Sequence, residues 1–251
     1  MSNAYEAPES NLVNENLSTG DYGSVEKAIR GEYEFSIGSV LSEAWAKTSG
    51  SKWPIHLGFF YYFLVVIAVM FGLGIVMAGL MAVTEDASVI VLVQIVIQLG
   101  VNLIVMPMVM GIVMMGIKRS VDAPINASMV FNNFSKMLPL FATVILMYIM
   151  ILIGFILLVI PGIYLMIAYY MAMPLVVEKG MSPWQAMETS RKAITHRWFS
   201  VFGLFIVMAI ILTISMIPLG LGMIWTLPMM MIAYGILYRN MFGVEASTVA
   251  E

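Results

Sequence analysis

The stretch MLPLFATVILMYIMILIGFILLVIPGIYLMIAYYMAMPLVV, from Met137 to Val177, decides the fold class. It contains no charged side chain, and it is about twice as long as the roughly 20 residues that a helix needs to cross a bilayer. Its strongest turn signal is Pro161-Gly162, a pair that is typical of a hairpin. We therefore expect two membrane-spanning helices joined there. These helices cover residues 138–160 and 163–177.

The rest of the chain holds more uncharged runs of similar length. Glu85 and Asp86 separate the first two, and the turn signal Pro218-Leu219-Gly220 divides the last one. Together they predict four more spanning helices. These helices cover residues 55–83, 88–117, 198–217 and 219–240.

The composition supports this reading. Hydrophobic residues make up 61% of the 251-residue chain and charged residues only 11%, whereas a soluble protein has about 25% charged residues. A soluble fold of this length cannot bury so much apolar surface. The net charge of -3 and the lack of a basic block give no sign of nucleic-acid binding, and the chain has no cysteine.

The positive charges give the orientation. All 12 Lys and Arg residues lie before the first predicted helix, in the loops after the second and fourth, or, for Arg239, at the C-terminal end of the sixth. Because cytoplasmic loops carry an excess of Lys and Arg, both termini are expected in the cytoplasm. The predicted fold is all-α: a polytopic membrane protein with six transmembrane helices in three hairpins.

The polar segments complete the predicted organisation. Residues 1–34 predict a disordered acidic cytoplasmic tail, and residues 242–251 a short cytoplasmic tail. Residues 35–53 and 178–197 alternate apolar and charged positions at helical spacing, which predicts amphipathic interfacial helices. A weaker copy of this pattern lies before the middle hairpin.

The basic side chains of the segment 178–197 are candidates for contact with lipid. Each basic residue near an anionic membrane surface contributes about 1 kcal/mol. We therefore predict that Arg191, Lys192 and Arg197 contact anionic headgroups.

An internal repeat is one interpretation of the polar segments. Five residues before the first hairpin match five before the last at a constant offset, which is the signature of a repeated unit. The matched residues are Glu43, Lys47, Lys52, Trp53 and Gly58 against Glu188, Lys192, Arg197, Trp198 and Gly203. If the repeat is real, three hairpins should pack with pseudo-symmetry.

The predicted helix over 88–117 carries three carboxamides, Gln94, Gln98 and Asn102, spaced by four and therefore on one face. In hydrocarbon each needs a partner. Either they are hydrogen-bonding glue between helices, or they line a small polar cavity. This helix is also longer than a bilayer requires, so it must tilt, protrude or break, and Pro107 is the natural place for a kink.

The same face continues with Met106, Met110 and Met114. Thioethers are soft ligands that suit Cu(I), so a metal site is a weak alternative. The chain has 25 methionines, which makes ordinary packing the favoured interpretation. We expect no metal and no cofactor.

The segment 138–238 resembles a broad group of bacterial inner-membrane proteins. This group includes uncharacterised six-helix proteins and the membrane domain fused to some glycerophosphodiester phosphodiesterases. The resemblance implies a bacterial inner (cytoplasmic) membrane protein and brings no catalytic residue. The residues that carry it are Leu157 to Tyr164, Pro174, Glu178, Gly180, Ala186, Ser190 and Trp198.

No charged residue falls inside a predicted span except Arg239, next to the end of the last one, and no catalytic motif is present. The sequence therefore predicts a non-enzymatic membrane protein that acts by association with lipid, with itself as a homo-oligomer, or with a larger membrane complex. The alternative is a transporter or channel for a neutral or lipid-like solute, lined by the carboxamides.

Overall fold

The computed structural model describes residues 22–250. Every regular element in that range is a helix, as predicted. The α-helices are α1 (Val25–Arg30), α2 (Ile37–Lys47), α3 (Lys52–Val83), α4 (Ala87–Ser120), α5 (Met137–Leu157), α6 (Val159–Ala168), α7 (Ala172–Glu178), α8 (Pro183–His196), α9 (Trp198–Met216), α10 (Met223–Phe242) and α11 (Ala246–Ala250), and the 3-10 turns are η2 (Ala127–Phe131) and η3 (Phe134–Lys136).

Five helical segments in the described range are long and apolar enough to cross a membrane, where the sequence predicts six. The helix α10, which corresponds to the sixth predicted span, is not among them. The five segments are Lys52–Val83, Ala87–Ser120, Ala127–Leu157, Val159–Glu178 and Trp198–Met216.

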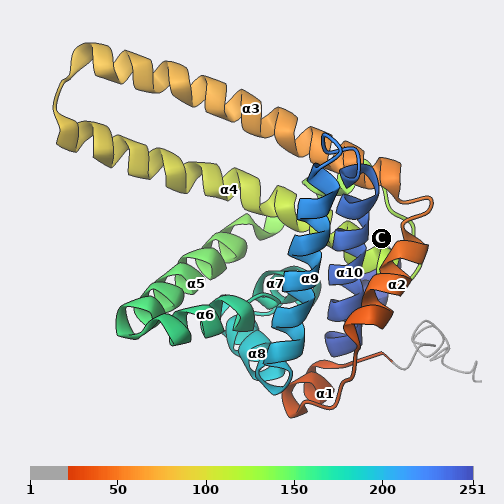
Figure 1. Cartoon of the computed structure of the whole chain (residues 1–251). Helices are drawn as coiled ribbons and strands as arrows, with labels where there is room; N and C mark the ends of the chain where they lie inside the picture. The colour runs from red at the N-terminus through yellow and green to blue at the C-terminus, as the bar shows by residue number, and fades with distance from the viewer. Residues whose placement is uncertain (1–21, 251) are drawn as a thin grey trace, which may run out of the picture.

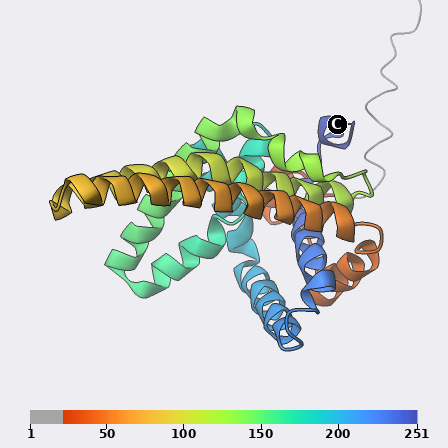
Figure 2. The ribbon, with the colours of Figure 1, turned by 90° about the horizontal axis from the view of Figure 1, so that it is seen from above.

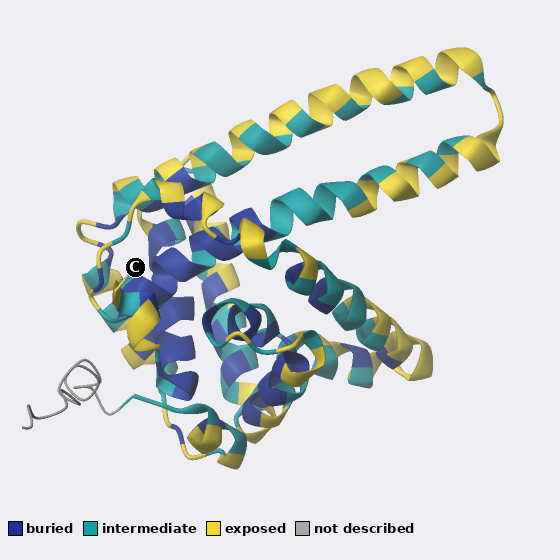
Figure 3. Ribbon diagram, turned by 180° about the vertical axis from the view of Figure 1, so that it is seen from behind, coloured by how far each residue is buried: buried dark blue, intermediate teal, exposed yellow. Residues whose placement is uncertain are grey.

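The helices α3 and α4 form a long hairpin that extends away from the rest of the molecule (Figure 1). Its outer part is covered by no other described segment, and large apolar side chains are exposed along it (Figure 3). The helix α4 continues without a break through Pro107. Of the three options that its length leaves open, a break at Pro107 is therefore excluded, and tilting or protruding from the bilayer stay predictions.

The helix α10 lies at the centre of the molecule and packs against α4, α2, α9, α1 and α3. The contact with α4 is close because two glycines face each other. A Cβ atom added to Gly235 would lie 2.2 Å from the carbonyl oxygen of Gly116, and one added to Gly116 would lie 2.0 Å from the carbonyl oxygen of Met231. The two backbones therefore touch, which buries most of α10.

The hairpin turn predicted at Pro161 and Gly162 is in the wrong place. The chain reverses at Leu158, whose backbone is extended between α5 and α6, and Pro161 lies in the first turn of α6. A proline is tolerated there because the N–H groups of a first helical turn have no partner within the helix. Gly162 instead allows close packing against the ring of Phe155 in α5.

The predicted helix over 163–177 is also divided, into α6 and α7. The Ser190 hydroxyl, from α8, accepts a hydrogen bond from the Met171 N–H at 3.1 Å and donates one to the Ala168 carbonyl at 2.7 Å. One buried side chain thus satisfies both backbone ends at the break, so the break costs little.

The second predicted turn is in place. The chain turns between α9 and α10, after Pro218, with Leu219 and Gly220 both at positive φ (54° and 79°). Glycine adopts this conformation without strain, which explains its position in the turn.

The N-terminal region departs from the predicted disordered tail. Residues 1–21 lie outside the described residues, but α1 is a capped helix, with Ser24 at its start and Gly31 at its end. The Tyr33 hydroxyl donates to the Ala193 carbonyl at 2.9 Å, and Ala28 is fully buried. Two buried anchors therefore hold this segment against α8, and the burial raises the pKa of Tyr33.

Helices are present at both positions where the sequence predicts amphipathic ones, α2 and α8, but the middle copy is not an α-helix. Two short 3-10 turns, η2 and η3, stand before α5. Asn and Ser side chains in this segment compete for backbone hydrogen bonds and disfavour a helix. The first and last copies do share an ion pair at the same spacing, Lys47 to Glu43 at 3.8 Å and Lys192 to Glu188 at 3.5 Å.

The three hairpins diverge rather than run side by side (Figures 1 and 2). The Nζ atom of Lys52, at the start of α3, lies 5.2 Å from the ring centroid of Trp225, at the start of α10. The turn between α9 and α10 therefore lies beside the base of the first hairpin. In the predicted bundle of six spans, this turn and Lys52 would lie on opposite faces of the bilayer.

Candidate functional site

A cavity of about 420 Å³ lies between the base of the α3/α4 hairpin, the α5 to α7 unit and α10, and is here called the central cavity. Its walls are almost entirely apolar. It is lined by Phe59, Tyr62, Val109, Met110, Ile112, Val113, Met147, Met166, Tyr170, Met173, Met231 and Tyr234.

The break between α6 and α7 positions the aromatic wall of the central cavity. Tyr170 lies in that break. The centroid of its ring is 4.1 Å from that of Phe205 and 4.8 Å from that of Tyr234. The Tyr234 hydroxyl donates to the Tyr170 carbonyl at 2.9 Å. The segment between the two helices is thus fixed to α10, and Tyr170 is held at the wall.

Two hydroxyls of the wall differ from the rest. Tyr62 and Tyr170 line the central cavity, and within residues 22–250 neither phenol hydroxyl makes a hydrogen bond. No charged side chain belongs to the lining. The site can therefore hold an apolar group and donate hydrogen bonds to an acceptor such as an ester, and the tyrosine phenols are the only ionisable groups of its described walls.

The three carboxamides Gln94, Gln98 and Asn102, here called the carboxamide stripe, lie away from the central cavity, on the outer part of α4. Gln94 and Gln98 are exposed, and Asn102 donates to the Gln98 carbonyl of its own helix at 2.8 Å. Within the described range no hydrogen bond joins these side chains to another helix, and they do not line the central cavity. Both interpretations, glue and cavity lining, stay predictions, and glue would need a partner outside this part of the chain.

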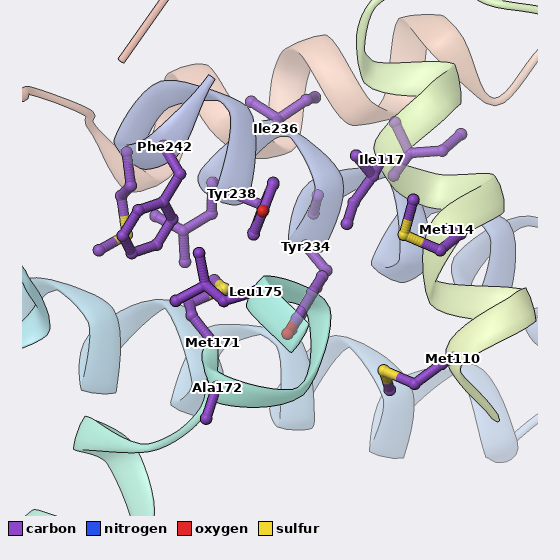
Figure 4. Close-up of a cluster of buried hydrophobic side chains, with 14 of the residues drawn as sticks. Met110, Met114, Ile117, Met171, Ala172, Leu175, Tyr234, Ile236, Tyr238 and Phe242 are labelled. Carbon is purple, nitrogen blue, oxygen red and sulfur yellow. The ribbon is translucent and has the colours of Figure 1, made fainter. Parts of the chain in front are cut away.

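The methionine stripe leads from that outer part into the core. Met110 and Met114 are buried in the main hydrophobic cluster (Figure 4), whereas Met106 is half-buried. Met110 also lines the central cavity. The packing role is therefore visible for two of the three thioethers, and a metal site remains a prediction.

The three basic residues predicted to contact lipid headgroups form ion pairs with acidic side chains. Arg191 donates two hydrogen bonds to Glu188, at 2.9 and 2.7 Å, and these bonds lower the pKa of the Glu188 carboxyl. Lys192 is 3.5 Å from the same carboxylate, and Arg197 is 3.4 Å from Glu34. All three remain partly exposed, so contact with lipid stays a prediction, but each already has an acidic partner.

The sequence contained only weak signals for the central cavity. Tyr62 is expected near a membrane interface, where tyrosine is common, and Tyr170 stands within an uncharged run. A tyrosine in such a run needs a hydrogen-bond partner or an opening. This requirement was the one sign in the sequence of a cavity near Tyr170, but it does not specify which helices surround that cavity.

Comparison of the chain with family models, with curated proteins and with solved structures finds no match. The resemblance to the membrane domain of glycerophosphodiester phosphodiesterases therefore stays a prediction. The class of the protein follows from its own fold: an all-helical chain whose described part has five helices able to cross a membrane, with an apolar cavity among them.

Proposed function

We propose that this protein is a non-enzymatic integral membrane protein that acts by association with lipid, and that it holds one acyl chain in the central cavity. The observation that carries the proposal is the cavity itself, at about 420 Å³ within the usual range of ligand sites and lined almost entirely by apolar side chains. Assembly with a second copy or a larger complex is part of the same proposal, since Gln94 and Gln98 would find partners there.

The position of the central cavity supports an acyl chain as its occupant. Its lining comes from the bases of two apolar hairpins, α3/α4 and α5/α6, whose outer parts expose large apolar side chains. In a bilayer these surfaces face lipid tails. A tail can therefore enter between the hairpins without crossing water, and Tyr62 and Tyr170 can donate hydrogen bonds to an ester linkage.

Replacing Val113 with Phe should fill the central cavity and displace the acyl chain. We expect a phospholipid with a photoactivatable diazirine in its acyl chain to cross-link wild-type protein near Tyr170, and the variant to lose at least nine-tenths of those adducts. Mass-spectrometric mapping of the adducts measures this effect. The matched control is Val91→Phe, on the exposed part of α4, which should keep all of them.

Equal labelling of both variants near Tyr170 would contradict the proposal. Adducts on the outer parts of α3 and α4 serve as an internal reference, because these surfaces meet lipid in either case.

We further propose that the membrane is a bacterial inner membrane, with both termini cytoplasmic, and that α10 stays at its cytoplasmic side. Since the turn before α10 then lies on that side too, α9 does not cross either, although it is long and apolar enough to do so. Each end of α10 lies beside a cation that the positive-inside rule assigns to the cytoplasm, Lys52 near Trp225 and Arg239 in the last turn. The distance along the helix between Trp225 and Arg239 is about 21 Å. That is less than the hydrocarbon thickness of about 30 Å.

A topology reporter inserted after Ile217 should therefore report the cytoplasm, and so should reporters after Ile117 and Val177. Reporters after Val83 and Ile160, at the tips of the two crossing hairpins, should report the periplasm. Alkaline phosphatase and green fluorescent protein fusions give opposite signals on the two sides. A periplasmic signal after Ile217 would instead support six crossings.

A further inference from the structure

A second cavity, of about 270 Å³, lies where the ends of α4 and α7 meet η2, η3 and α11, and is here called the polar pocket. Polar side chains make up most of its wall. It is lined by Met114, Lys118, Met129, Asn132, Asn133, Ser135, Lys136, Val177, Glu178, Ser247 and Thr248.

Two lysines of the polar pocket have no acidic partner in the described part of the chain. Lys118 is only 4% exposed, and within residues 22–250 its ammonium makes no hydrogen bond and no ion pair. The same holds for Lys136, which is half-buried. Among the described residues no fully buried side-chain nitrogen lacks a hydrogen-bond partner, so the Lys118 ammonium opens onto the pocket rather than being enclosed in the core. Neither lysine forms an ion pair in this part of the chain.

The one carboxylate of the polar pocket is already satisfied. Glu178 accepts hydrogen bonds from the Tyr238 hydroxyl at 2.8 Å, from the Thr248 hydroxyl at 3.3 Å and from the Glu245 backbone N–H. The Lys179 ammonium lies 3.3 Å from Glu178 and 2.7 Å from Glu245, so it is shared between two carboxylates. Three ammonium groups, those of Lys118, Lys136 and Lys179, therefore stand against two carboxylates, which leaves the pocket and its rim with a net positive charge.

The remaining polar side chains of the wall are available as donors. Asn132, Asn133, Ser135 and Ser247 make no side-chain hydrogen bond to any residue in the range 22–250. Ammonium, amide and hydroxyl donors around a small space are the groups that bind phosphate oxygens. The chemistry of the polar pocket is therefore that of an anion site.

The polar pocket and the central cavity are adjacent along the same two helices. On α4, Met110 lines the central cavity, and Met114 and Lys118 line the polar pocket. Figure 4 shows Met110 and Met114 on this helix. On α7, Met173 lines the first and Val177 the second. A step of four residues is one helical turn, about 6 Å. The two cavities thus follow each other as an apolar compartment and a cationic one.

We propose that the polar pocket binds a phosphate monoester or diester, namely the headgroup phosphate of an anionic lipid whose acyl chain lies in the central cavity. Lys118 and Lys136 neutralise the phosphate, and the Asn and Ser side chains donate to its oxygens. The assignment of the lipid as the source rests on the proposed function. A free phosphate ion has the same chemistry and is the alternative source.

The test measures thermal stabilisation of the full-length protein by three probes: phosphatidylcholine nanodiscs containing phosphatidic acid, nanodiscs of phosphatidylcholine alone, and inorganic phosphate. We expect phosphatidic acid to stabilise the wild type and Lys118→Gln to raise the half-maximal concentration at least tenfold, as expected for one hydrogen bond to a charged group. Lys136→Gln, at a half-buried position, should act in the same direction and serves if Lys118→Gln does not fold.

The matched control is Arg30→Gln, which also removes one positive charge, from the exposed ion pair with Glu32, and should leave the response unchanged. Equal stabilisation by inorganic phosphate would support the anion site and assign free phosphate as its source. No stabilisation by either phosphate probe, or equal loss in Lys118→Gln and Arg30→Gln, would overturn the inference.

The proposed function, acyl-chain binding in the central cavity, can be tested separately from the phosphate site. Val113→Phe should abolish acyl cross-linking and keep the response to inorganic phosphate, because Val113 lines only the central cavity. Acyl cross-linking of the wild type without any preference for phosphatidic acid or phosphate would leave the proposed function standing and overturn the phosphate site.

Discussion

Replacing Arg239 with Met is expected to lower the free energy of unfolding by about 3 kcal/mol, since loss of one partner from a buried ion pair costs about 3 to 5 kcal/mol. The Arg239 side chain is 7% exposed and donates two hydrogen bonds to Glu43, at 2.7 and 2.9 Å, and a third to the Ser120 carbonyl. It therefore joins α10 to α2 and to the end of α4. We take the lower end of the range because Glu43 is about one-third exposed and keeps Lys47 at 3.8 Å.

The measurement is the midpoint and slope of SDS-induced unfolding in mixed micelles, followed by circular dichroism. Arg191→Met is the matched control, because Arg191 also makes two hydrogen bonds to a glutamate but lies on the surface of one helix, about one-third exposed. It should cost less than about 1 kcal/mol. Similar losses in both variants would mean that Arg239 is not the link between α10 and its neighbours.

A double variant separates two causes of the lost stability: the loss of the ion pair and the change in the size of the side chain. If Glu43 is destabilising once its partner is lost, adding Glu43→Gln to Arg239→Met should recover part of the stability. A cost equal to the sum of the two single variants would indicate that the two side chains act independently.

The sequence predicted the parts of this fold that depend on local pattern. Uncharged runs of sufficient length predicted α3, α4, α5 and α9, and alternating polar and apolar positions predicted α2 and α8. These patterns report only how each helix meets its surroundings. They do not distinguish a helix covered by lipid from one covered by protein, so they do not show that α10, apolar along its length, is surrounded by other helices.

Hairpin positions were less predictable because they depend on contacts. Pro161 was a strong turn signal, yet the reversal lies at Leu158, where α5 ends. The break at Tyr170 had no local signal, because the serine that satisfies it lies in α8. A residue distant in the sequence decides this position, and a single sequence does not show which one.

The polar pocket shows the same limit for the candidate site. The spacing of four that marks Met110 and Met114 continues to Lys118, so the sequence already placed a cation on the face that enters the core. From the sequence alone, we interpreted Lys118 as a marker of the cytoplasmic side, because Lys and Arg residues at the ends of membrane helices usually have that meaning. Only the packing of α7, η2, η3 and α11 shows that Lys118 lines a pocket and, within residues 22–250, forms no ion pair with the one carboxylate there.

Replacing Gly116 with Ala is expected to destabilise the protein by about 3 kcal/mol or more, at the upper end of the cost of overpacking. The added Cβ would lie 2.0 Å from the carbonyl oxygen of Met231, and a backbone atom cannot rotate away as a side chain can. The helices α4 and α10 must then separate. The same unfolding experiment as for Arg239 measures the loss.

The matched control for Gly116 is Gly100→Ala, on the same helix but at a position where an added Cβ meets no atom within 4 Å. Alanine favours a helix over glycine by about 1 kcal/mol, so this variant should be neutral or slightly stabilising. If Gly116→Ala lowers the free energy of unfolding while Gly100→Ala raises it or leaves it unchanged, then α4 packs tightly against α10 at one end and faces lipid at the other. If Gly116→Ala were as stable as Gly100→Ala, the close contact between α4 and α10 would not exist, and the walls of the central cavity that these two helices form would not be in place.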